Sequence, residues 1–445
     1  MILGGGASGL SLSRLTGAQI IESERTPGGH AVSTEIDGYT FDRGPHIIFS
    51  RSKLLLECMV NSLGTNVHES TRNNKVFVRG KLLKYPIEND LAGLSQSDKI
   101  KCLIGYVEAQ IANAGGLRQT RDLADWFNNS FGIDLTELYF RPYNEKVWKV
   151  PLENLSMTWS ERIPRPPLGD VVRSAMGEKT EGYVHQLHYH YPLNGGYSAL
   201  MKAWAMAIDP NLLNLDEAVL KIEPINGGLQ VVTSKGMRTA KRIVSTIPLS
   251  HLPELMPEMP IAVIQAISRL RTNSTITVTV AFKGTDLNQW TAVYLPEVDY
   301  LPNRISFPTV FSPRNSPVGQ FLVQAEITSP SLDNFKDMND QRLIDHVVHG
   351  LRLNKLVSDE AEFVTAFVER YQLAYVVYTK GFEDDLALVV DWAKSLGIFL
   401  HGRFGSHNYL NVDGCLEQSI GLARQLGNGW TDEDLVKRFT QIGEV

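Results

Sequence analysis

Gly4-Gly5-Gly6-Ala7-Ser8-Gly9 decides the fold class of this chain, because apolar segments of different character stand on either side of it. Met1 to Leu3 is a short strand-like run before it, and Leu10 to Leu15 after it is compatible with a helix. Ala18 to Glu22 then reads as a second strand. This order of strand, glycine turn, helix and strand predicts the start of a Rossmann-like α/β domain.

The spacing of the glycines has a mechanical meaning in such a domain. Gly4 permits the tight turn, Gly6 lets the backbone approach a pyrophosphate, and Gly9 lets the helix pack on the strand. The phosphates would lie at the helix N-terminus, where free N–H groups favour anions. Glu22 follows Gly4 by 18 residues, at the strand end where a carboxylate accepts ribose hydroxyls. These residues predict a dinucleotide site, with a solvated strand-end glutamate as the alternative for Glu22.

Composition and charge exclude several classes of protein. The 445 residues include 43 Lys+Arg and 49 Asp+Glu, and the net charge of −6 argues against a nucleic-acid or anionic-membrane binder. Cys58, Cys102 and Cys415 are too few and too scattered for a disulfide framework or a cysteine-ligated metal site. No apolar run reaches the ~18 residues of a membrane span, and three residues before the first glycine leave no room for a signal peptide. We expect a cytoplasmic protein without membrane insertion.

The residues after Glu22 distinguish flavin from nicotinamide binding. Gly28-Gly29 follows the glutamate, and this longer signature resembles the flavin-binding amine-oxidase and protoporphyrinogen-oxidase-like superfamily. The resemblance implies that the second glycine pair lies beneath the FAD pyrophosphate and flavin. Val219 begins a segment similar to the strand whose backbone reads the adenine, and Ile243 to Pro248 resembles the strand that closes the FAD sheet. FAD is therefore the expected cofactor.

Within that superfamily the chain resembles the UDP-galactopyranose mutase family, particularly its eukaryotic-type and related bacterial members. The matching runs, in chain order, are Phe41 to Ser50, Lys84 to Asn89, Phe140 to Trp148, Trp159, Arg162 to Arg165, Tyr191 to Gly196, Pro302 to Arg304 and Gly402 to Ser406. Each run alone is moderately specific, and their shared order is more so. The resemblance extends from Ile2 to about Leu426.

This resemblance implies a non-redox isomerisation of a nucleotide sugar. The expected reaction interconverts the pyranose and furanose forms of UDP-galactopyranose or a close relative, through an adduct between N5 of reduced FAD and the sugar. The flavin would act as a covalent nucleophile that divides one difficult rearrangement into easier steps. NAD(P)H is a candidate reductant of the flavin. The resemblance also implies that the product supplies galactofuranose for cell-surface glycan biosynthesis.

The resemblance also implies which residues hold the substrate pyrophosphate. Arginine supplies the fixed charge and forked donors that a pyrophosphate needs, and Arg304 lies in one matching run. Arg162 or Arg165 lies in the other, and the sequence does not decide which of the two faces the substrate. A structural arginine paired to a carboxylate is the alternative for each. Further residues similar to the family's phosphate-end tyrosines are Tyr375, Tyr378 and Tyr409.

Further site residues follow from the same resemblance. His46, in a Gly-Pro-His turn, resembles the loop beside the flavin ring, and Arg403 is a candidate partner of the FAD pyrophosphate. Asn411 and Asp413 are expected near the ribityl chain or flavin edge. On the nucleotide side, the candidates are Tyr143 for stacking on the uracil, Asn144 for a hydrogen bond to the uracil or sugar, and Trp159 as an apolar anchor.

Some residues depart from the family pattern. Glu88 stands where the family often has Gln, Arg51 where it has a second histidine, and Gly414 follows Asp413 where Gln or His is usual. These departures bear on the identity of the sugar. They also keep open a flavoprotein-derived binding or scaffold protein without turnover. His185, His188 and His190 are interpreted as non-metal residues, so no metal site is predicted.

The expected architecture is α/β, with a Rossmann-like FAD-binding domain, a helical insertion and a mixed, largely antiparallel sheet domain for the substrate. The FAD-binding domain is predicted to be discontinuous, from residues 1–85, 190–265 and 385–445. Residues 86–189 read as mainly helical and residues 266–384 as mainly sheet. The alternative function is an FAD-dependent oxidase or desaturase of the protoporphyrinogen-oxidase-like type. A small nucleotide sugar is the expected partner, no nucleic acid is expected, and a homo-oligomer remains open.

Overall fold

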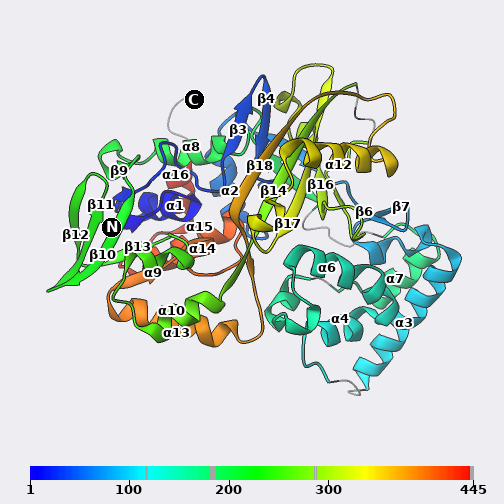
Figure 1. Cartoon of the computed structure of the whole chain (residues 1–445), viewed down its shortest axis with the longest axis horizontal. Coiled ribbons are helices and arrows are strands. Elements are labelled where there is room, and N and C mark those ends of the chain that lie inside the picture. The colour runs from blue at the N-terminus through cyan, green and yellow to red at the C-terminus, as the bar shows by residue number, and fades with distance from the viewer. Residues whose placement is uncertain (116–118, 164, 181–186, 285, 287, 441–445) are drawn as a thin grey trace. The chain divides into compact units, whose positions relative to one another are not determined.

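The computed structural model describes the chain except residues 116–118, 164, 181–186, 285, 287 and 441–445. The chain divides into two compact units (Figure 1). The first consists of residues 1–70, 188–271 and 381–445, and the second of residues 71–187 and 272–380. The sequence predicted three parts, whereas the helical and sheet segments here form one unit. In the described part of the chain, no helix is both long and apolar enough to cross a bilayer.

The first unit is built on a parallel sheet. Its strand order is β19 (Ile398–Leu400), β13 (Ile243–Ser245), β1 (Ile2–Leu3), β2 (Ile20–Ile21) and β9 (Leu213–Asn214), with each neighbouring pair parallel. Both residues of β1 and of β2 are buried, as expected for a sheet covered on both faces. The glycine turn therefore leaves the middle strand, which confirms the Rossmann-like start.

The remaining elements of the first unit surround that sheet. An antiparallel three-stranded sheet contains β10 (Val219–Ile225), β11 (Gly228–Thr233) and β12 (Gly236–Ala240), and a hairpin contains β3 (Ser33–Ile36) and β4 (Tyr39–Asp42). The helices are α1 (Ala7–Thr16), α2 (Lys53–Asn61), α8 (Ser198–Met206), α9 (Leu252–Leu255), α10 (Ile261–Arg269), α13 (Phe382–Ser395), α14 (Gly402–Gly405), α15 (Val412–Gln425) and α16 (Asp432–Phe439). Two further strands are β5 (His68–Thr71) and β8 (His188–Tyr191).

The second unit contains a seven-stranded mixed sheet. Its order is β18 (Glu362–Val377), β14 (Arg271–Lys283), β17 (Gln320–Ser329), β16 (Arg304–Ser306), β15 (Ala292–Tyr294), β6 (Asn74–Val78) and β7 (Lys81–Lys84). The β14–β17, β17–β16, β16–β15 and β6–β7 pairs are antiparallel, and β15–β6 is parallel. The mixed, largely antiparallel sheet that the sequence predicted is thereby confirmed.

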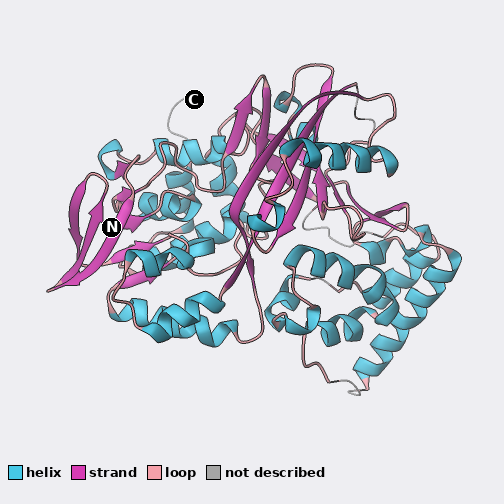
Figure 2. Ribbon diagram, in the orientation of Figure 1, coloured by secondary structure: helices cyan, strands magenta, loops and turns pink. Residues whose placement is uncertain are grey.

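The helices of the second unit are α3 (Gln96–Ala114), α4 (Leu123–Phe131), α5 (Ile133–Leu135), α6 (Arg141–Trp148), α7 (Leu168–Ala175), α11 (Pro308–Phe311) and α12 (Asp340–Leu353). Figure 2 shows this unit as a region of strands and a region of helices. The hairpin of β6 and β7 belongs to the large sheet, so the first segment of the first unit ends at residue 70 and not at the expected 85. The pairing of β6 with β15, distant in the chain, could not be read from the local sequence.

The two faces of the large sheet differ in polarity. Ile276, Val278 and Val280 alternate along β14 and pack with Leu343 and Val347 of α12 in one hydrophobic core. Most intervening residues of the central strands point to the opposite face and are polar although buried, among them Thr275, Thr277, Thr279, Gln324, Glu326 and Ser306. A buried polar sheet face is costly unless its groups find partners, which makes it a candidate site.

Candidate functional site

The glycine turn of the first unit is shaped by close contacts at two of its glycines. At Gly4 the backbone has a φ of 101°, and a Cβ there would lie 2.2 Å from Thr246 Oγ1. A Cβ at Gly9 would lie 2.0 Å from the carbonyl oxygen of Gly4. The turn and the packing of α1 on β1 therefore both require glycine, as the sequence predicted for these two positions.

Gly6 is different, because no protein atom crowds it. A Cβ at Gly6 would lie 3.8 Å from its nearest neighbour, Gly29 Cα, which is an ordinary contact. Gly6 is the N-cap of α1, and this helix start has neither a side-chain cap nor an acidic residue in its first turn. Such a bare helix start with a cradle that a Cβ would fill fits a bound pyrophosphate. The residues present thus fit the dinucleotide expected here.

Glu22 and the second glycine pair lie beside the turn. Gly28 donates its N–H to Gly5 O at 2.8 Å, and a Cβ at Gly29 would meet Gly6 Cα at 3.2 Å. Glu22 is 8% exposed, and its Oε2 accepts the Gly5 N–H at 2.5 Å. A carboxylate has further lone pairs, so this bond leaves capacity for ribose hydroxyls. The glutamate also fixes the turn, a role the sequence did not reveal.

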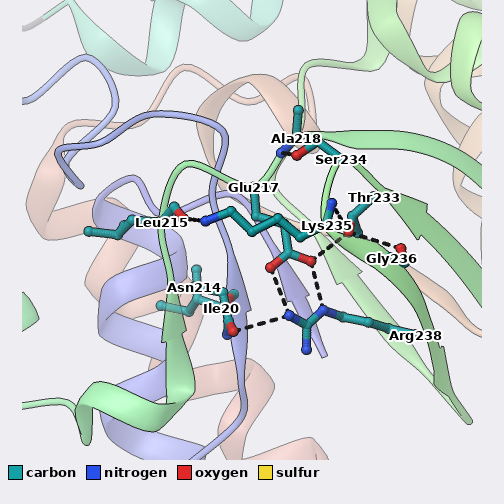
Figure 3. Close-up of polar contacts among 10 residues, drawn as sticks. All are labelled: Ile20, Asn214, Leu215, Glu217, Ala218, Thr233, Ser234, Lys235, Gly236 and Arg238. Carbon is teal, nitrogen blue, oxygen red and sulfur yellow. Dashed lines mark hydrogen bonds and ion pairs between the residues drawn. The ribbon is translucent and has the colours of Figure 1, made fainter.

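The polar cluster around Glu217 that Figure 3 shows is bonded to the strand end that carries Glu22. Arg238 donates from Nε and Nη2 to the two carboxylate oxygens of Glu217, at 2.8 and 2.7 Å. Glu217 also accepts the Thr233 hydroxyl at 2.6 Å, and its backbone N–H donates to Glu22 O at 2.8 Å. Val219, the predicted adenine reader, opens β10 just beyond this cluster. The Glu217–Arg238 ion pair therefore fixes Glu217, which is bonded to the backbone of Glu22 and stands two residues before Val219.

The predicted residues near the C-terminus surround α14 and the start of α15. The Arg403 guanidinium lies 4.2 Å from the Tyr409 ring centroid and donates to Leu410 O at 3.0 Å. Asn411 is the N-cap residue of α15 and makes no side-chain capping bond. Asp413 lies in the first turn of that helix, where its Oδ1 accepts the Gly414 N–H. These residues lie together in the first unit, and their contact with a cofactor stays a prediction.

Two histidines of the first unit, His30 and His46, lie near one another and near arginine side chains. Burial, reinforced by Arg403, Arg43 and His46, lowers the pKa of His30 to about 3, so this ring is neutral at physiological pH. The His46 Nδ1 lies 2.8 Å from Gly44 O, which places the ring proton on Nδ1. His30 was not predicted as a site residue, although its position directly after Gly28-Gly29 is a usable signal.

A cross-strand row of side chains crosses the polar face of the second unit's sheet. Strand register places Thr277 opposite Glu326, Glu326 opposite Arg304, and Arg304 opposite Tyr294. Directly opposed residues on one face have Cβ atoms about 5 Å apart. Four strands therefore contribute adjacent side chains, and Arg304 stands within this row.

Arg304 is held by a buried carboxylate. Its Nε donates to Glu326 Oε2 at 2.6 Å, and Nη2 also pairs with that oxygen. Tyr375 donates its hydroxyl to Glu326 Oε1 at 2.5 Å. Burial opposes the charge on Arg304, yet the neighbouring Glu326 raises its pKa well above the usual value. The guanidinium is thus permanently charged. It is paired to a carboxylate, which the sequence analysis kept as the alternative for Arg304 without naming Glu326 as the partner.

One edge of the Arg304 fork remains available. Among the described residues, none accepts a hydrogen bond from Nη1, and the Arg304 side chain is 25% exposed whereas Glu326 is 3% exposed. An arginine that uses one edge for a buried carboxylate can offer its other N–H groups to a phosphate. Glu326 could have been suspected, because it is the one acidic residue in the otherwise strand-like run Phe321 to Thr328.

Aromatic rings surround this part of the second unit. Tyr143 packs edge-on against Tyr294, with ring centroids 5.5 Å apart, and Trp148 packs edge-on against Tyr375 at 5.9 Å. Trp148 also stacks on Trp159 at 4.1 Å, and Trp159 contacts the Tyr378 ring at 5.2 Å. The structure therefore brings Tyr143, Trp159, Tyr375 and Tyr378 together with Arg304 in the second unit, and their contact with a substrate stays a prediction.

Other predicted residues have different surroundings. The Asn144 amide donates to Phe140 O at 2.7 Å and accepts from Trp148 Nε1 at 3.1 Å, so both ends are engaged within its own helix. Arg165 is exposed, and the side chain of Arg162 lies outside the described residues. The choice between these two arginines therefore stays open. Among the described residues there is no group of three or more His, Cys, Asp or Glu that could hold a metal ion.

Comparison with known proteins relates the whole chain to flavoproteins. A family model described as flavin containing amine oxidoreductase matches residues 13–426. A crystal structure of reduced UDP-galactopyranose mutase has a TM-score of 0.86 at 22% identity, covering 100% of this chain and 99% of the other. A candidate protoporphyrinogen oxidase from Exiguobacterium sp. 255-15 has a TM-score of 0.75 at 18% identity, covering 96% and 97%. Wild-type putrescine oxidase bound to putrescine has a TM-score of 0.66 at 15% identity, covering 96% and 98%. At these identities the likeness concerns the fold.

Proposed function

The chain belongs to the flavin containing amine oxidoreductase family, and within that family we propose that it is an FAD-dependent mutase of a nucleotide sugar. The proposed reaction interconverts pyranose and furanose forms of UDP-galactopyranose or a close relative. The fold likeness to UDP-galactopyranose mutase along the entire chain supports this reading. The observation that carries it is the charged Arg304, whose Nη1 has no acceptor among the described residues and which lies among aromatic rings.

The first unit would hold the cofactor without a covalent bond. The N-terminus of α1 would receive the pyrophosphate over Gly6, and Glu22 would accept the ribose hydroxyls. The Glu217–Arg238 ion pair would keep Glu22 and the adenine-reading strand β10 in place. When bound in its reduced form, the flavin supplies a nucleophile for the anomeric carbon of the sugar.

The second unit would hold the leaving nucleotide. Arg304 would donate from Nη1 to a phosphate oxygen while Glu326 fixes the opposite edge of its guanidinium. The Tyr143, Tyr294 and Tyr375 rings would exclude water around that contact, which strengthens a charge-assisted hydrogen bond. Retaining the pyrophosphate is what allows the sugar to rearrange and then recapture the same nucleotide.

An oxidase or desaturase acting on an apolar substrate is the second candidate. The stacked Trp148 and Trp159 rings and the fold likeness to a candidate protoporphyrinogen oxidase favour it. An apolar substrate has no use for a permanently charged guanidinium beside a buried carboxylate, which favours the mutase.

The decisive experiment incubates dithionite-reduced protein with UDP-galactopyranose and analyses the products for UDP-galactofuranose. The mutase reading expects product without net consumption of reductant, because each turnover returns the flavin reduced. NAD(P)H should therefore be needed only in catalytic amounts. Substrate turnover in strict proportion to NAD(P)H or oxygen would establish the oxidase reading instead.

A further inference from the structure

Lys146 of helix α6 brings a buried ammonium group to the backbone of a distant segment. The residue is 7% exposed and lies in the last turn of the helix. Its Nζ donates to the carbonyl oxygens of Leu295, Glu297, Tyr300 and Pro302, at distances of 2.9, 2.6, 2.6 and 2.7 Å. Each of these acceptors is a backbone carbonyl, so peptide dipoles stabilise the charge of the lysine.

The four carbonyl oxygens belong to one short loop. This loop, residues 295–303, connects β15 to β16, and Arg304 is the first residue of β16. Leu295 donates its N–H to Asn303 O at 2.9 Å, which closes the base of the loop. Carbonyl oxygens that converge on one point repel one another, whereas a cation at that point attracts all of them, as a potassium ion does in a ring of carbonyls. The loop therefore resembles a cation site in which the Lys146 ammonium is the cation.

The other side of the loop is attached to helix α12. The Tyr300 hydroxyl donates to Val347 O at 3.0 Å, and the Leu301 N–H donates to His346 Nε2 at 3.0 Å. Neither bond involves α6. Without the ammonium of Lys146, the loop would thus keep its attachment to α12 and lose these four bonds to α6.

Helix α6 also carries a ring of the proposed nucleotide site. Tyr143 precedes Lys146 by three residues, so the two side chains lie on neighbouring positions of one helix face. The Tyr143 ring packs edge-on against Tyr294, the last residue of β15, with centroids 5.5 Å apart. Tyr294 stands directly opposite Arg304 in the strand register. The same stretch of α6 therefore contacts both the strand end at Tyr294 and the loop that follows it.

The backbone of Lys146 is attached to the strand that carries Glu326. The Lys146 carbonyl oxygen accepts the Thr328 hydroxyl at 3.0 Å, and Thr328 lies two residues beyond Glu326 on β17. The Thr328 N–H donates to Asn303 Oδ1 at 3.1 Å, and Asn303 directly precedes Arg304. Lys146 thus joins α6 to both strands that form the Arg304–Glu326 pair.

A neutral side chain makes a similar attachment just beyond Lys146. Asn273 Nδ2 donates to the carbonyl oxygens of Val147 and Trp148, at 3.0 and 2.9 Å. An attachment between α6 and the sheet therefore needs no charge by itself. Burial disfavours an ammonium and lowers the pKa of Lys146 to about 7. An amide nitrogen has two protons to donate, whereas four converging carbonyls are better satisfied by a cation with three.

We propose that Lys146 is a positioning residue of the nucleotide site, whose ammonium holds the loop before Arg304 against α6 and so fixes the guanidinium relative to the Tyr143 ring. Lys146 itself does not touch the nucleotide. This inference rests on the proposed function, because that proposal assigns Arg304 and Tyr143 to the nucleotide. Removal of the ammonium lets the carbonyls separate, and a shift of about 1 Å far from the reacting atoms can cost about 100-fold.

Lys146→Met tests this role, because it keeps the apolar stem and removes the ammonium. We expect the Kd for UDP, measured by flavin fluorescence well below the melting temperature, to rise about 10- to 100-fold with unchanged FAD content. Asn273→Ala is the matched control, since it should lower the melting temperature and leave the Kd unchanged. Equal UDP affinity in wild type and Lys146→Met would overturn the proposal. A wild type that does not bind UDP would refute the proposed function, and the positioning role with it.

Chemical rescue tests whether the ammonium itself is responsible. Lys146→Ala lacks three carbons and the ammonium group, which n-propylammonium supplies. This ion should recover about tenfold in UDP affinity, whereas tetramethylammonium at the same concentration cannot donate hydrogen bonds and should recover none. Rescue by both ions, or by neither, would attribute the loss to ionic strength or to the cavity and overturn the proposal.

The melting temperature gives a measurement that does not depend on nucleotide binding and also guards against poor folding of the variant. Propylammonium should raise the melting temperature of Lys146→Ala and leave that of wild type unchanged, because the site in wild type already holds the lysine ammonium. An equal response of the two proteins would show that the loop is not a cation site, which would refute the proposal even if UDP binds.

Discussion

Arg304 and Glu326 lie directly opposite each other in the β16–β17 pair, and the Arg304 Nε donates to Glu326 Oε2 at 2.6 Å. Glu326 is almost fully buried and also accepts the Tyr375 hydroxyl. The pair therefore joins two roles, since it satisfies a buried carboxylate and orients the guanidinium edge proposed for the substrate. Experiments on Arg304 must separate these roles.

Arg304→Ala should weaken UDP binding by about 30- to 1000-fold, which corresponds to about 2–4 kcal/mol for a charge-assisted contact in a partly desolvated site. The same change should lower the thermal stability, because it leaves the Glu326 carboxylate buried without its partner. Arg304→Lys should recover only part of the affinity, since an ammonium lacks the planar fork. Titration of UDP followed by flavin fluorescence measures the affinity.

The control combines Arg304→Ala with Glu326→Gln. The neutral amide removes the unpaired charge, so the double variant should regain stability while its UDP affinity stays low. Equal UDP affinity in wild type and both variants would remove Arg304 from the substrate site and leave it a structural residue.

Alanine substitution at the two end glycines of α1, Gly6 and Gly17, should affect different properties: FAD binding at Gly6 and stability at Gly17. Gly6→Ala adds a methyl group where the pyrophosphate is expected but where no protein atom lies closer than 3.8 Å. We expect loss of FAD with little change in the melting temperature of the flavin-free protein. Gly17→Ala, at the C-cap with a φ of 67°, should lower stability by about 1 kcal/mol and leave FAD affinity unchanged. Full FAD occupancy of Gly6→Ala would contradict the cofactor assignment.

Non-covalent attachment of the cofactor is the expected state. The glycine turn, Glu22 and the start of α1 supply the contacts that a dinucleotide needs. Acid precipitation should therefore release yellow FAD into the supernatant. Flavin that remains with the precipitated protein would contradict this expectation.

Glu88 should make stability depend on pH. Burial raises the pKa of this carboxyl group to about 7, and its Oε2 has no hydrogen-bond partner among the described residues. Two titratable groups that interact with Glu88, the Tyr106 and Tyr139 hydroxyls, are uncharged at these pH values because their own pKa values are raised. An ordinary glutamate titrates near pH ~4.3. The folded protein therefore binds more protons than the unfolded chain between about pH 4.5 and 7, and the free energy of unfolding falls as pH rises through that window.

Glu88→Gln removes this titration and is nearly the same shape. The penalty for the buried carboxylate is fully present above pH ~7 and is on the order of 3 kcal/mol. The melting temperature of Glu88→Gln minus that of wild type should therefore be higher at about pH 8 than at about pH 5. An equal difference at both pH values would show that Glu88 does not titrate in the folded protein.

Lys146 should be important for the segment that leads to Arg304. Its Nζ lies 2.6–2.9 Å from four backbone carbonyl oxygens, those of Leu295, Glu297, Tyr300 and Pro302. Lys146→Met keeps the apolar stem but leaves these carbonyls without the ammonium. We expect a loss of several kcal/mol of stability, at about 1–3 kcal/mol for each buried acceptor left unpaired. Chemical denaturation measures the change, and Lys149→Met on the same helix end is the control.

The parts of the molecule that depend on short-range sequence were predictable. The glycine turn and Glu22 lie within 22 residues, and the close contact at Gly9 is with the nearby Gly4 backbone, whereas the contact at Gly4 is with the distant Thr246. The sheet character of residues 266–384, which include the long strand β14, was also evident from the sequence. The aromatic residues around Arg304 were indicated only by the family resemblance, since no local rule brings Tyr143 and Tyr375 together.

The features that escaped prediction depend on pairing between distant segments. Strands β15 and β16 have three residues each, too short for a periodic signal, so the opposition of Arg304 and Glu326 could not be read. The Lys146 contacts join residues about 150 positions apart. The membership of β6 in the large sheet depends on the same kind of long-range register.

Strand register must be correct during folding for the cross-strand row of Thr277, Glu326, Arg304 and Tyr294 to form. Side chains alternate between the two faces of a strand, so a one-residue slip of β16 would turn Arg304 into the core against α12 and bring Ile305 to the polar face. Such misaligned intermediates would lack the guanidinium that is proposed to bind phosphate. A nucleotide that binds only the correctly aligned sheet would stabilise it by mass action, so the substrate would help to select the native register as the protein matures.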